Sequence, residues 1–380
     1  MGTFVLTDEQ KDLQALAKEF ADKEIRPISA EWDVIGDTPP ELYKKAADMG
    51  FTSMALPEEF GGLGLNYHTQ AIINEQLSMG DVGFANALGA SQFACRPVLI
   101  AGTDEQKRYV VDTVINGGMA SFALTEPNAG SDASALRTTA VKSGDEYILN
   151  GRKCFITNAP HAQFFCVFAK TAPEKGHRGI SCFLVERDRV GVSVGKHEDK
   201  MGFRLATASD IVFDEVHVPA DHLIGVENKG YNLAMKILDY SRIGVAAEGV
   251  GLAQEALNLA VAYAKDRVTF GKPIAQHQGI QFMLADMELK IQSARALCYE
   301  VADLAEAGVP GFGKISSCAK VAASDAAVAV ACDALQIFSG YGYMKDYRIE
   351  KLYRDAKLQQ IFEGTNQIQR MIIGGSLMRE

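Results

Sequence analysis

The spacing of hydrophobic positions changes twice along the chain. Over about residues 1–117, apolar residues recur at helical spacing, as at Leu13, Leu16 and Phe20. The tetrapeptide TDEQ occurs at 7–10 and again at 103–106. In both copies Gln follows Thr by three residues, the pattern of a capping box, which satisfies the free N–H groups at a helix start. We therefore expect a helical first segment whose helices begin at these two sites.

The middle and last segments differ in the spacing of their hydrophobic residues. Between about 118 and 225, short runs rich in β-branched and aromatic residues, such as EYILNGRKCFITNA and FFCVFAK, alternate with Gly, Asn and Pro. This pattern predicts an antiparallel β domain. From about 226 to 380, long helical patterns return, and AGVPGFG interrupts them once. Ala and Gly at helix crossings favour a bundle.

We therefore predict an α+β protein of three domains. They are an N-terminal helical domain (1–117), a central antiparallel β domain (118–225) and a C-terminal helical bundle (226–380). A chain of 380 residues is too long for one compact core. No low-complexity linker separates the segments, so we expect them to pack together.

Composition narrows the class of protein. The net charge of −10 and the lack of a Lys/Arg block argue against nucleic-acid binding. The seven cysteines contain no C-x-x-C pair, which is typical of reduced thiols in a cytoplasmic protein. We find no secretory signal and no uncharged apolar run near the roughly 20 residues of a membrane span. We expect a cytoplasmic protein without a membrane span.

Common nucleotide and metal motifs are missing. GVGLAQ at 249–254 begins like G-x-G-x-x-G, but Gln254 replaces the third Gly and no strand pattern precedes it. There is no P-loop sequence and no H-E-x-x-H sequence. The seven histidines show no metal-ligand spacing, so we expect no metal site.

Two stretches are ambiguous when they are considered alone. In QQIFEGTNQIQR (359–370), Glu363 follows a helical run, where the helix dipole and apolar neighbours would raise its pKa. It is either a solvated helix-end residue or a functional base. In LTEPNAGSDASAL (124–136), a tight polar turn is either a surface loop or a place where a ligand approaches the backbone.

Together the motifs carry a resemblance. LTEPNAGSD, CFITNA, DRVTFGKPIAQHQ, LQIFSGYGY and IFEGTNQIQR occur in the order and spacing of the acyl-CoA dehydrogenase family, over almost the whole chain. The chain looks closest to the short-chain, butyryl-CoA dehydrogenase-like branch. The resemblance implies a helical domain, a β domain and a four-helix bundle. It also implies FAD-dependent oxidation of the Cα–Cβ bond of an acyl-CoA, a homotetramer, and electron transfer to electron-transferring flavoprotein.

Glu363 matches the family's catalytic base. A weakly acidic α C–H requires a base with a raised pKa in a desolvated position. The family also polarises the thioester carbonyl, through the backbone N–H of this Glu and the FAD ribityl 2′-hydroxyl. Hydride then passes from Cβ to flavin N5. Some members carry the base on the long C-terminal helix instead, but Ser241 occupies that position here and cannot serve as a carboxylate base.

The resemblance also implies binding residues. Thr125 and Thr157 would bond the isoalloxazine, Phe155 would cover it, and Arg267 would hold the pyrophosphate across a subunit interface, unless Arg267 is only a surface cation. The full set of expected FAD contacts is Phe122, Leu124, Thr125, Ser131, Phe155, Thr157, Arg267, Thr269, Phe270, His277, Gln278, Gln336, Gly340, Thr365 and Gln367. The expected contacts of the CoA thioester are Ser131, Tyr231, Asp239, Arg242 and Gly364. Asp239 and Arg242 are three residues apart and could instead form a simple intrahelical ion pair.

Several alternatives stay open. Arg348 stands where relatives usually show Pro, and Phe362 where many carry Tyr; we expect neither to change the reaction class. The same site could act as an enoyl-CoA reductase, as an acyl-CoA oxidase or as a flavin-binding scaffold without catalysis. ANALGASQFACRP (85–97) is expected near the acyl group. Its small residues could make room for a branched, cyclic or aromatic acyl group, or they could let two helices pack closely. We favour close helix packing, and we take butyryl-CoA as the default substrate.

Overall fold

The computed structural model describes residues 6–379. In its first segment Thr7 and Thr103 each accept a hydrogen bond from the backbone of the Gln three residues later, whose side chain bonds back, so both predicted capping boxes are present. The helices of this segment are α1 (Asp8–Phe20), the π-helix η1 (Ala21–Ile25), α2 (Arg26–Ile35), α3 (Pro40–Asp48), the short η2 (Glu58–Phe60), α4 (Tyr67–Gly80), α5 (Val82–Ala101) and α6 (Asp104–Ile115).

The second segment forms one seven-stranded sheet. Its strands are β1 (Met119–Ala123), β2 (Thr139–Ser143), β3 (Glu146–Thr157), β4 (Ala162–Lys170), β5 (Ile180–Glu186), β6 (Val192–Val194) and β7 (Ala208–Pro219), with the short helices η3 (Ala133–Ala135), η4 (Pro173–Gly179) and η5 (Ala220–His222) between them. The order is β1-β4-β2-β3-β7-β6, and β5 pairs with β4. The sheet is mixed and not purely antiparallel as predicted, because β1 runs parallel to β4 with the β2–β3 hairpin in the connection.

The third segment is helical again. It contains α7 (Gly230–Asp266), the small strands β8 (Val268–Thr269) and β9 (Lys272–Pro273), η6 (Ile274–Gln276), α8 (Gln278–Glu306), α9 (Gly313–Phe338), η7 (Ser339–Tyr343), α10 (Ile349–Gln359) and α11 (Asn366–Leu377). Helices α7, α8 and α9 pack on one another, and α10 and α11 pack on α9. This three-part arrangement confirms the predicted fold class, a helical region, a β region and a helical bundle.

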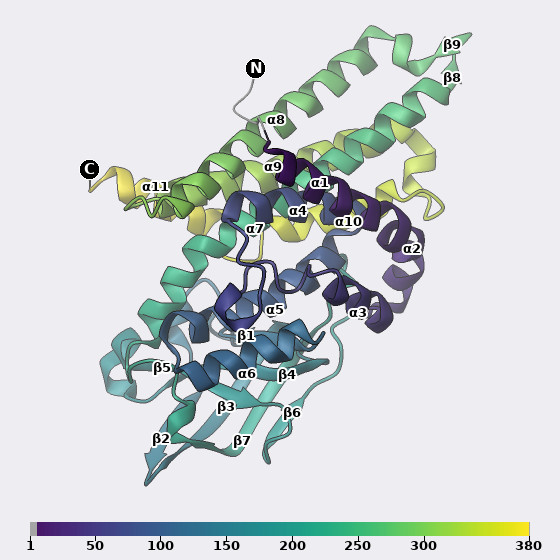
Figure 1. The fold of residues 1–380 in the computed structure, drawn as a ribbon. Coiled ribbons are helices and arrows are strands. Elements are labelled where there is room, and N and C mark those ends of the chain that lie inside the picture. Colours follow the sequence, from purple (N-terminus) through teal and green to yellow (C-terminus); the bar gives the residue numbers. More distant parts are fainter. Residues whose placement is uncertain (1–5, 380) are drawn as a thin grey trace.

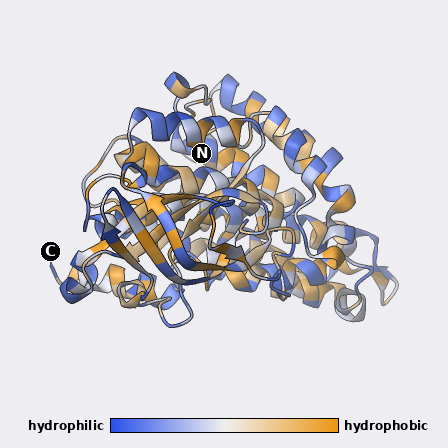
Figure 2. Ribbon diagram, turned by 90° about the horizontal axis from the view of Figure 1, so that it is seen from below, coloured by the Kyte–Doolittle hydropathy of each residue, from blue (hydrophilic) through white to orange (hydrophobic). Residues whose placement is uncertain are grey.

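The three parts meet around α4, α5 and α7. Helix α4 contacts α7 and α8 of the bundle, while α5 packs on both α7 and β1. Figure 1 shows the sheet at one end of the molecule, the β8–β9 hairpin at the other, and α4 and α5 between. In Figure 2 hydrophilic and hydrophobic residues are interspersed along the helices, as expected for helices with one buried face.

Helix α9 is unusually long and apolar. By length and composition alone, the helix from Gly313 to Tyr343 could cross a membrane. Half of its most apolar window is buried inside the structure, where it packs against α7, α8, α10 and α11. A core helix of a folded bundle meets the same criteria.

Candidate active site

Glu363 lies in the turn between α10 and α11. Its φ is +53° and that of Gly364 is +85°, a left-handed conformation that strains the non-glycine residue. Gln369 supports the turn, since its Nε2 donates to the carbonyls of Glu363 (3.1 Å) and Gly364 (3.2 Å). The strain marks Glu363 as a residue that the surrounding structure holds in place.

A buried lysine on α9 also holds this turn in place. Lys320 is fully buried, and its Nζ donates to Gly364 O (3.0 Å) and to Asn366 Oδ1 (2.9 Å). Asn366 in turn bonds Ser324 and Asp325. Nothing in the local sequence around Glu363 predicted this contact, because Lys320 and Gly364 are 44 residues apart.

The surroundings of the carboxyl group favour its protonated form. Burial raises the pKa of Glu363, while the Ser241 hydroxyl and the charges of Arg242 and Lys320 lower it less. Ser241 Oγ donates to Glu363 Oε2 at 2.9 Å, so the residue at the family's alternative base position contacts this base directly. The carboxyl group is thus desolvated, with one hydroxyl partner.

The backbone around Glu363 leaves a donor available. Phe362 N bonds Leu358 O and Asn366 N bonds Gln360 O, but within residues 6–379 the N–H of Glu363 has no acceptor. An N–H next to a desolvated carboxyl group can stabilise negative charge that develops on a bound carbonyl oxygen.

The residues expected to bind the thioester surround this site in part. Arg242 is buried, its N–H donates to Asp239 Oδ1 (2.6 Å), and its charge lowers the pKa of Glu363. The intrahelical ion pair is therefore present. It does not use Arg242 Nε, which is buried without a partner. The Tyr231 ring contacts the His177 ring in a tilted arrangement, with ring centroids 5.4 Å apart, and Ser131 is exposed.

The first group of expected flavin contacts lies where β1 and β3 end. Cys154 N donates to Thr125 O (3.0 Å) and Ser121 Oγ to Thr157 O (2.7 Å), which brings the two ends together. Phe155 has φ +56° and is 68% exposed, beside an irregularity in the β3–β7 pairing. Phe122 on β1 packs against Phe93 of α5. These residues form a surface with an exposed ring.

The second group lies at the tip of the bundle. A cavity of about 700 Å³ is lined by Arg267, Thr269, Gln336 and Gly340, residues expected to bind the cofactor, and by Tyr341. The Arg267 guanidinium lies 5.4 Å from the centre of the Tyr341 ring. Phe270 is 95% exposed with its edge toward His277, and Gln278 begins α8. Four of the residues expected to bind the cofactor therefore line one cavity.

On a single chain the two groups are far apart. Figure 1 places the β8–β9 tip at the opposite end of the molecule from the sheet. Thr365 and Gln367 are separate again, at the start of α11, where Thr365 caps the helix by accepting from Ile368 N. Gln367 is exposed.

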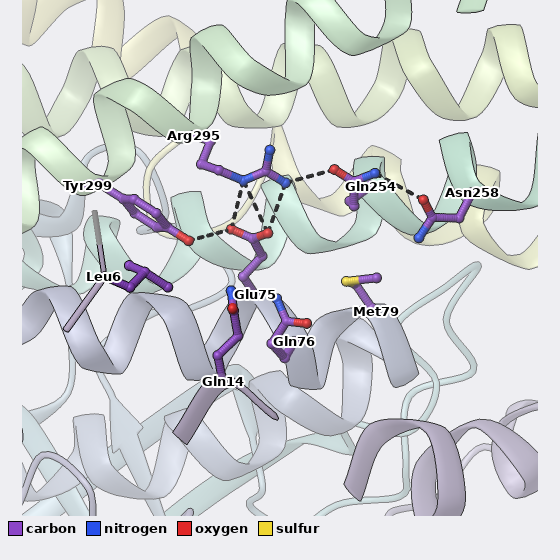
Figure 3. Close-up of a pocket in the computed structure, with 9 residues that line it drawn as sticks. All are labelled: Leu6, Gln14, Glu75, Gln76, Met79, Gln254, Asn258, Arg295 and Tyr299. Atoms are coloured by element: carbon purple, nitrogen blue, oxygen red, sulfur yellow. Dashed lines mark hydrogen bonds and ion pairs between the residues drawn. The ribbon is translucent and has the colours of Figure 1, made fainter. Parts of the chain in front are cut away.

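A different cavity, between α1, α4, α7 and α8, does not resemble a reaction site. It measures about 430 Å³. In Figure 3 Arg295 forms a bidentate pair with Glu75, which also accepts from Tyr299, and Arg295 donates to Gln254. The charged groups here satisfy one another, so the cavity has no base that could act on a ligand.

Asp37, His161 and His197 come together from three separate segments. Their ligand atoms lie within 4.8 Å of one another, close enough to hold a metal ion. His161 Nε2 and Asp37 Oδ1 already form a hydrogen bond of 2.6 Å, which joins the α2–α3 loop to the β3–β4 turn. Sequence spacing could not predict this group.

Arg348 and Phe362, the two residues that depart from the family pattern, both make defined contacts. Arg348 donates to Glu255 of α7 (2.6 Å) and to Met79 O of α4 (3.1 Å), so it links both helices. Phe362 packs edge-on against Phe203, with centroids 5.6 Å apart.

Comparison with known proteins assigns the family. Residues 7–118, 121–216 and 228–378 match the models of the N-terminal, middle and C-terminal domains of acyl-CoA dehydrogenase. A 3-(aryl)acrylate reductase of Clostridium sporogenes is 45% identical over 98% of this chain and 99% of the relative.

Solved structures agree in fold. Butyryl-CoA dehydrogenase from Megasphaera elsdenii is 42% identical, with a TM-score of 0.96 over 100% of both chains. A chain in a structure concerned with the electron-transferring flavoprotein of Acidaminococcus fermentans is also 42% identical, with a TM-score of 0.97 over 100% of both chains.

Proposed function

The chain belongs to the acyl-CoA dehydrogenase family, and from this premise we propose that it oxidises a short-chain acyl-CoA to the 2-enoyl-CoA. It is an oxidoreductase of this family, and its cofactor is FAD. The observation that carries the proposal is Glu363, a desolvated carboxyl group with a raised pKa beside a free backbone N–H.

Glu363 is proposed to take the α-proton of the thioester. Because burial raises its pKa, it is a stronger base than a solvated glutamate, which suits the weak acidity of an α C–H. The Ser241 hydroxyl donates to the carboxylate and so stabilises the ionised form, which is the form that takes the proton. Gln369 and Lys320 hold its turn and restrict the direction in which it reaches the substrate.

The backbone N–H of Glu363 is proposed to receive the thioester oxygen. As the α-proton leaves, negative charge develops on that oxygen, and a preorganised donor in a desolvated site lowers the barrier. FAD, when bound, supplies the acceptor for the hydride from the β-carbon. Asp239, Arg242, Tyr231, Ser131 and Gly364 are proposed to hold the CoA arm.

The residues present suit FAD. At the bundle tip, Arg267 and Thr269 offer donors for phosphate oxygens, and His277 Nε2 is buried without a partner, which a polar ligand group would satisfy. Phe155 exposes its ring beside Thr125 and Thr157, an arrangement that suits a planar ring system. The remaining cofactor contacts expected above are proposed with them.

We propose that a second copy of the chain completes each cofactor site. The tip residues and the sheet residues lie at opposite ends of one chain, so a partner's tip would have to approach the sheet. We also propose that the protein is a homotetramer, that it passes electrons to electron-transferring flavoprotein and that it is cytoplasmic. The domain boundaries near residues 117 and 225 are also proposed.

One relative favours a second candidate, an enoyl-CoA reductase. The 45% identical relative is named a 3-(aryl)acrylate reductase, and the same base and donor could serve reduction. A dehydrogenase of branched or cyclic acyl-CoAs uses the same residues as well, and an acyl-CoA oxidase differs in passing electrons to O₂.

Anaerobic titration of the FAD-loaded protein tests the proposal. Butyryl-CoA and other C4 to C8 thioesters, including branched, cyclic and aryl ones, are added while flavin absorbance is followed. Bleaching by butyryl-CoA, absent in Glu363→Gln, supports the dehydrogenase. Reoxidation of the reduced flavin by 2-enoyl-CoA faster than by electron-transferring flavoprotein favours the reductase, and rapid reoxidation in air favours the oxidase. A flavin that no thioester perturbs contradicts the proposed reaction class.

A further inference from the structure

Two glycines, Gly89 on α5 and Gly244 on α7, leave open space beside their backbones. A Cβ atom on Gly89 would meet nothing within 4 Å, and one on Gly244 would meet only the Asn74 Nδ2, at 3.6 Å. Gly244 follows Ser241 by three residues on α7, so it lies on the face that contacts Glu363. The space therefore begins at the base and continues along α7.

Glu248 lies on the same face of α7, one turn beyond Gly244. It is 5% exposed, and Asn86 Nδ2 of α5 approaches both of its oxygens, at 3.3 and 3.4 Å. Asn86 shares its helix face with Gly89, three residues later. The contact between Asn86 and Glu248 shows that the two glycine-bearing faces are turned toward each other.

The polar side chains near Glu248 make few hydrogen bonds. The Asn74 side chain makes no hydrogen bond with any residue of 6–379, and the buried Gln359 side chain makes none of ordinary geometry within that range, although it comes close enough to Glu248 to interact with its carboxyl group. Gln359 is near enough to Glu248 to lower its pKa. Two buried or partly buried amides and a carboxyl group thus gather at the end of the space that is remote from Glu363.

The Glu248 carboxyl group also has a raised pKa. Burial first, and then the charge of Glu363, raise the pKa of Glu248 to about 8, although Asn86 and Gln359 act to lower it. Near neutral pH its carboxyl group therefore both donates and accepts hydrogen bonds. An aliphatic acyl chain would strip water from these groups and offer no partner in exchange, which is unfavourable.

We infer that Glu248, with Asn74 and Asn86, forms a polar subsite that selects acyl-CoA substrates carrying a hydroxyl or amine at the end of the acyl chain. This inference rests on the proposed function, since it assigns the substrate class of the same site. Glu248 is a specificity residue, because the α- and β-carbons lie near Glu363 instead. The default substrate, butyryl-CoA, would then be a poor one.

The test compares isosteric thioesters in the FAD-loaded enzyme. 5-Hydroxypentanoyl-CoA and 5-aminopentanoyl-CoA are each matched with hexanoyl-CoA, in which a methyl group replaces the polar end, and the C4 and C6 ω-hydroxy compounds test length. The measurement is kcat/KM with an artificial electron acceptor. Because one lost hydrogen bond in a buried site is expected to change the rate constant about tenfold or more, we expect the wild type to prefer a polar member at least tenfold.

Variants show whether Glu248 causes the preference. Glu248→Leu should reverse it in favour of hexanoyl-CoA, whereas Glu248→Gln should keep the preference for hydroxyl and lose that for amine. Asn86→Leu provides a second route if Glu248→Leu loads FAD poorly. Asn258→Leu, an exposed position farther along α7, is the matched control and should leave the ratio unchanged.

Each outcome decides between the roles. A wild type that prefers hexanoyl-CoA, with the same ratio in Glu248→Leu, overturns the subsite and leaves Glu248 as the closed end of a cavity. In that case the proposed dehydrogenation still stands, because hexanoyl-CoA bleaches the flavin. If no thioester of either kind reduces the flavin, the proposed function itself fails, and the subsite fails with it.

Discussion

Two glutamates from two sequence motifs have opposite surroundings. Glu126, in LTEPNAGSD, is 6% exposed and accepts from Arg137 N (2.6 Å), Thr138 N (3.0 Å), Thr138 Oγ1 (2.6 Å) and Lys153 Nζ (2.8 Å). Among residues 6–379, the Glu363 carboxyl group accepts from Ser241 alone. Both are desolvated, which acts to raise each pKa, but Lys153 and the hydrogen bonds bring that of Glu126 below its ordinary value while that of Glu363 stays raised.

The difference teaches that burial alone does not make a base. A carboxylate with four donors, one of them an ammonium group, is held in its ionised form and has little acceptor capacity left for a substrate. A desolvated carboxyl group with one hydroxyl partner keeps both a raised pKa and an available oxygen. We therefore propose that Glu126 serves stability and Glu363 serves the reaction, and four predictions test this division.

The largest effect is expected from Glu363→Gln. It removes the base and keeps the side-chain volume, so flavin reduction by substrate should slow about 10²- to 10⁴-fold, with FAD still bound. Stopped-flow absorbance under anaerobic conditions measures the rate. Glu126→Gln is the matched control, and a comparable loss of rate in that variant at equal FAD content would remove the distinction.

Lys153→Met should affect stability most. Lys153 is fully buried, and its loss leaves Glu126 buried without a counter-charge, which costs about 3–5 kcal/mol. Urea unfolding of the FAD-loaded protein measures this. The double variant Lys153→Met/Glu126→Gln should recover part of the loss, and Lys142→Met, on the exposed part of β2, should cost little. A single variant as stable as wild type would mean that Glu126 is not held by this pair.

The sequence predicted the fold, and its resemblance to the family proposed Glu363 as the base, but neither predicted these surroundings. Capping boxes and strand alternation are local signals, so Thr7, Thr103 and the order of the three parts could be found from spacing. The partners that decide the protonation of Glu363 and Glu248 lie far away in the chain: Ser241 is 122 residues from Glu363, and Asn86 is 162 from Glu248. Such pairings depend on how α5, α7 and the α10–α11 turn pack.

Ser241→Ala should shift the pH dependence without removing the base. The hydroxyl donates to the ionised form of Glu363, so its loss disfavours that form and raises the pKa further. The rising limb of the rate of flavin reduction should therefore move to higher pH. Ser293→Ala, on the exposed face of α8, is the control. An unmoved limb would show that another group controls that ionisation.

The smallest effect concerns stability against pH, and here the two glutamates should have opposite signs. The folded pKa of Glu363 is raised, so its folding contribution is complete below the unfolded pKa of about 4.3 and falls as pH rises toward the folded value. Glu126 has a lowered folded pKa, so its contribution is present above the unfolded value and is lost as pH falls.

From pH 4 to pH 7, Glu363→Gln should therefore gain stability relative to wild type, while Glu126→Gln should lose it. Urea midpoints at several pH values measure the two differences, and equal slopes in both variants would mean that the glutamates are not distinguished by their partners. If the signs are opposite, as expected, Glu363 weakens the fold in its ionised form, and that cost accompanies the desolvation that suits it to remove a weakly acidic proton.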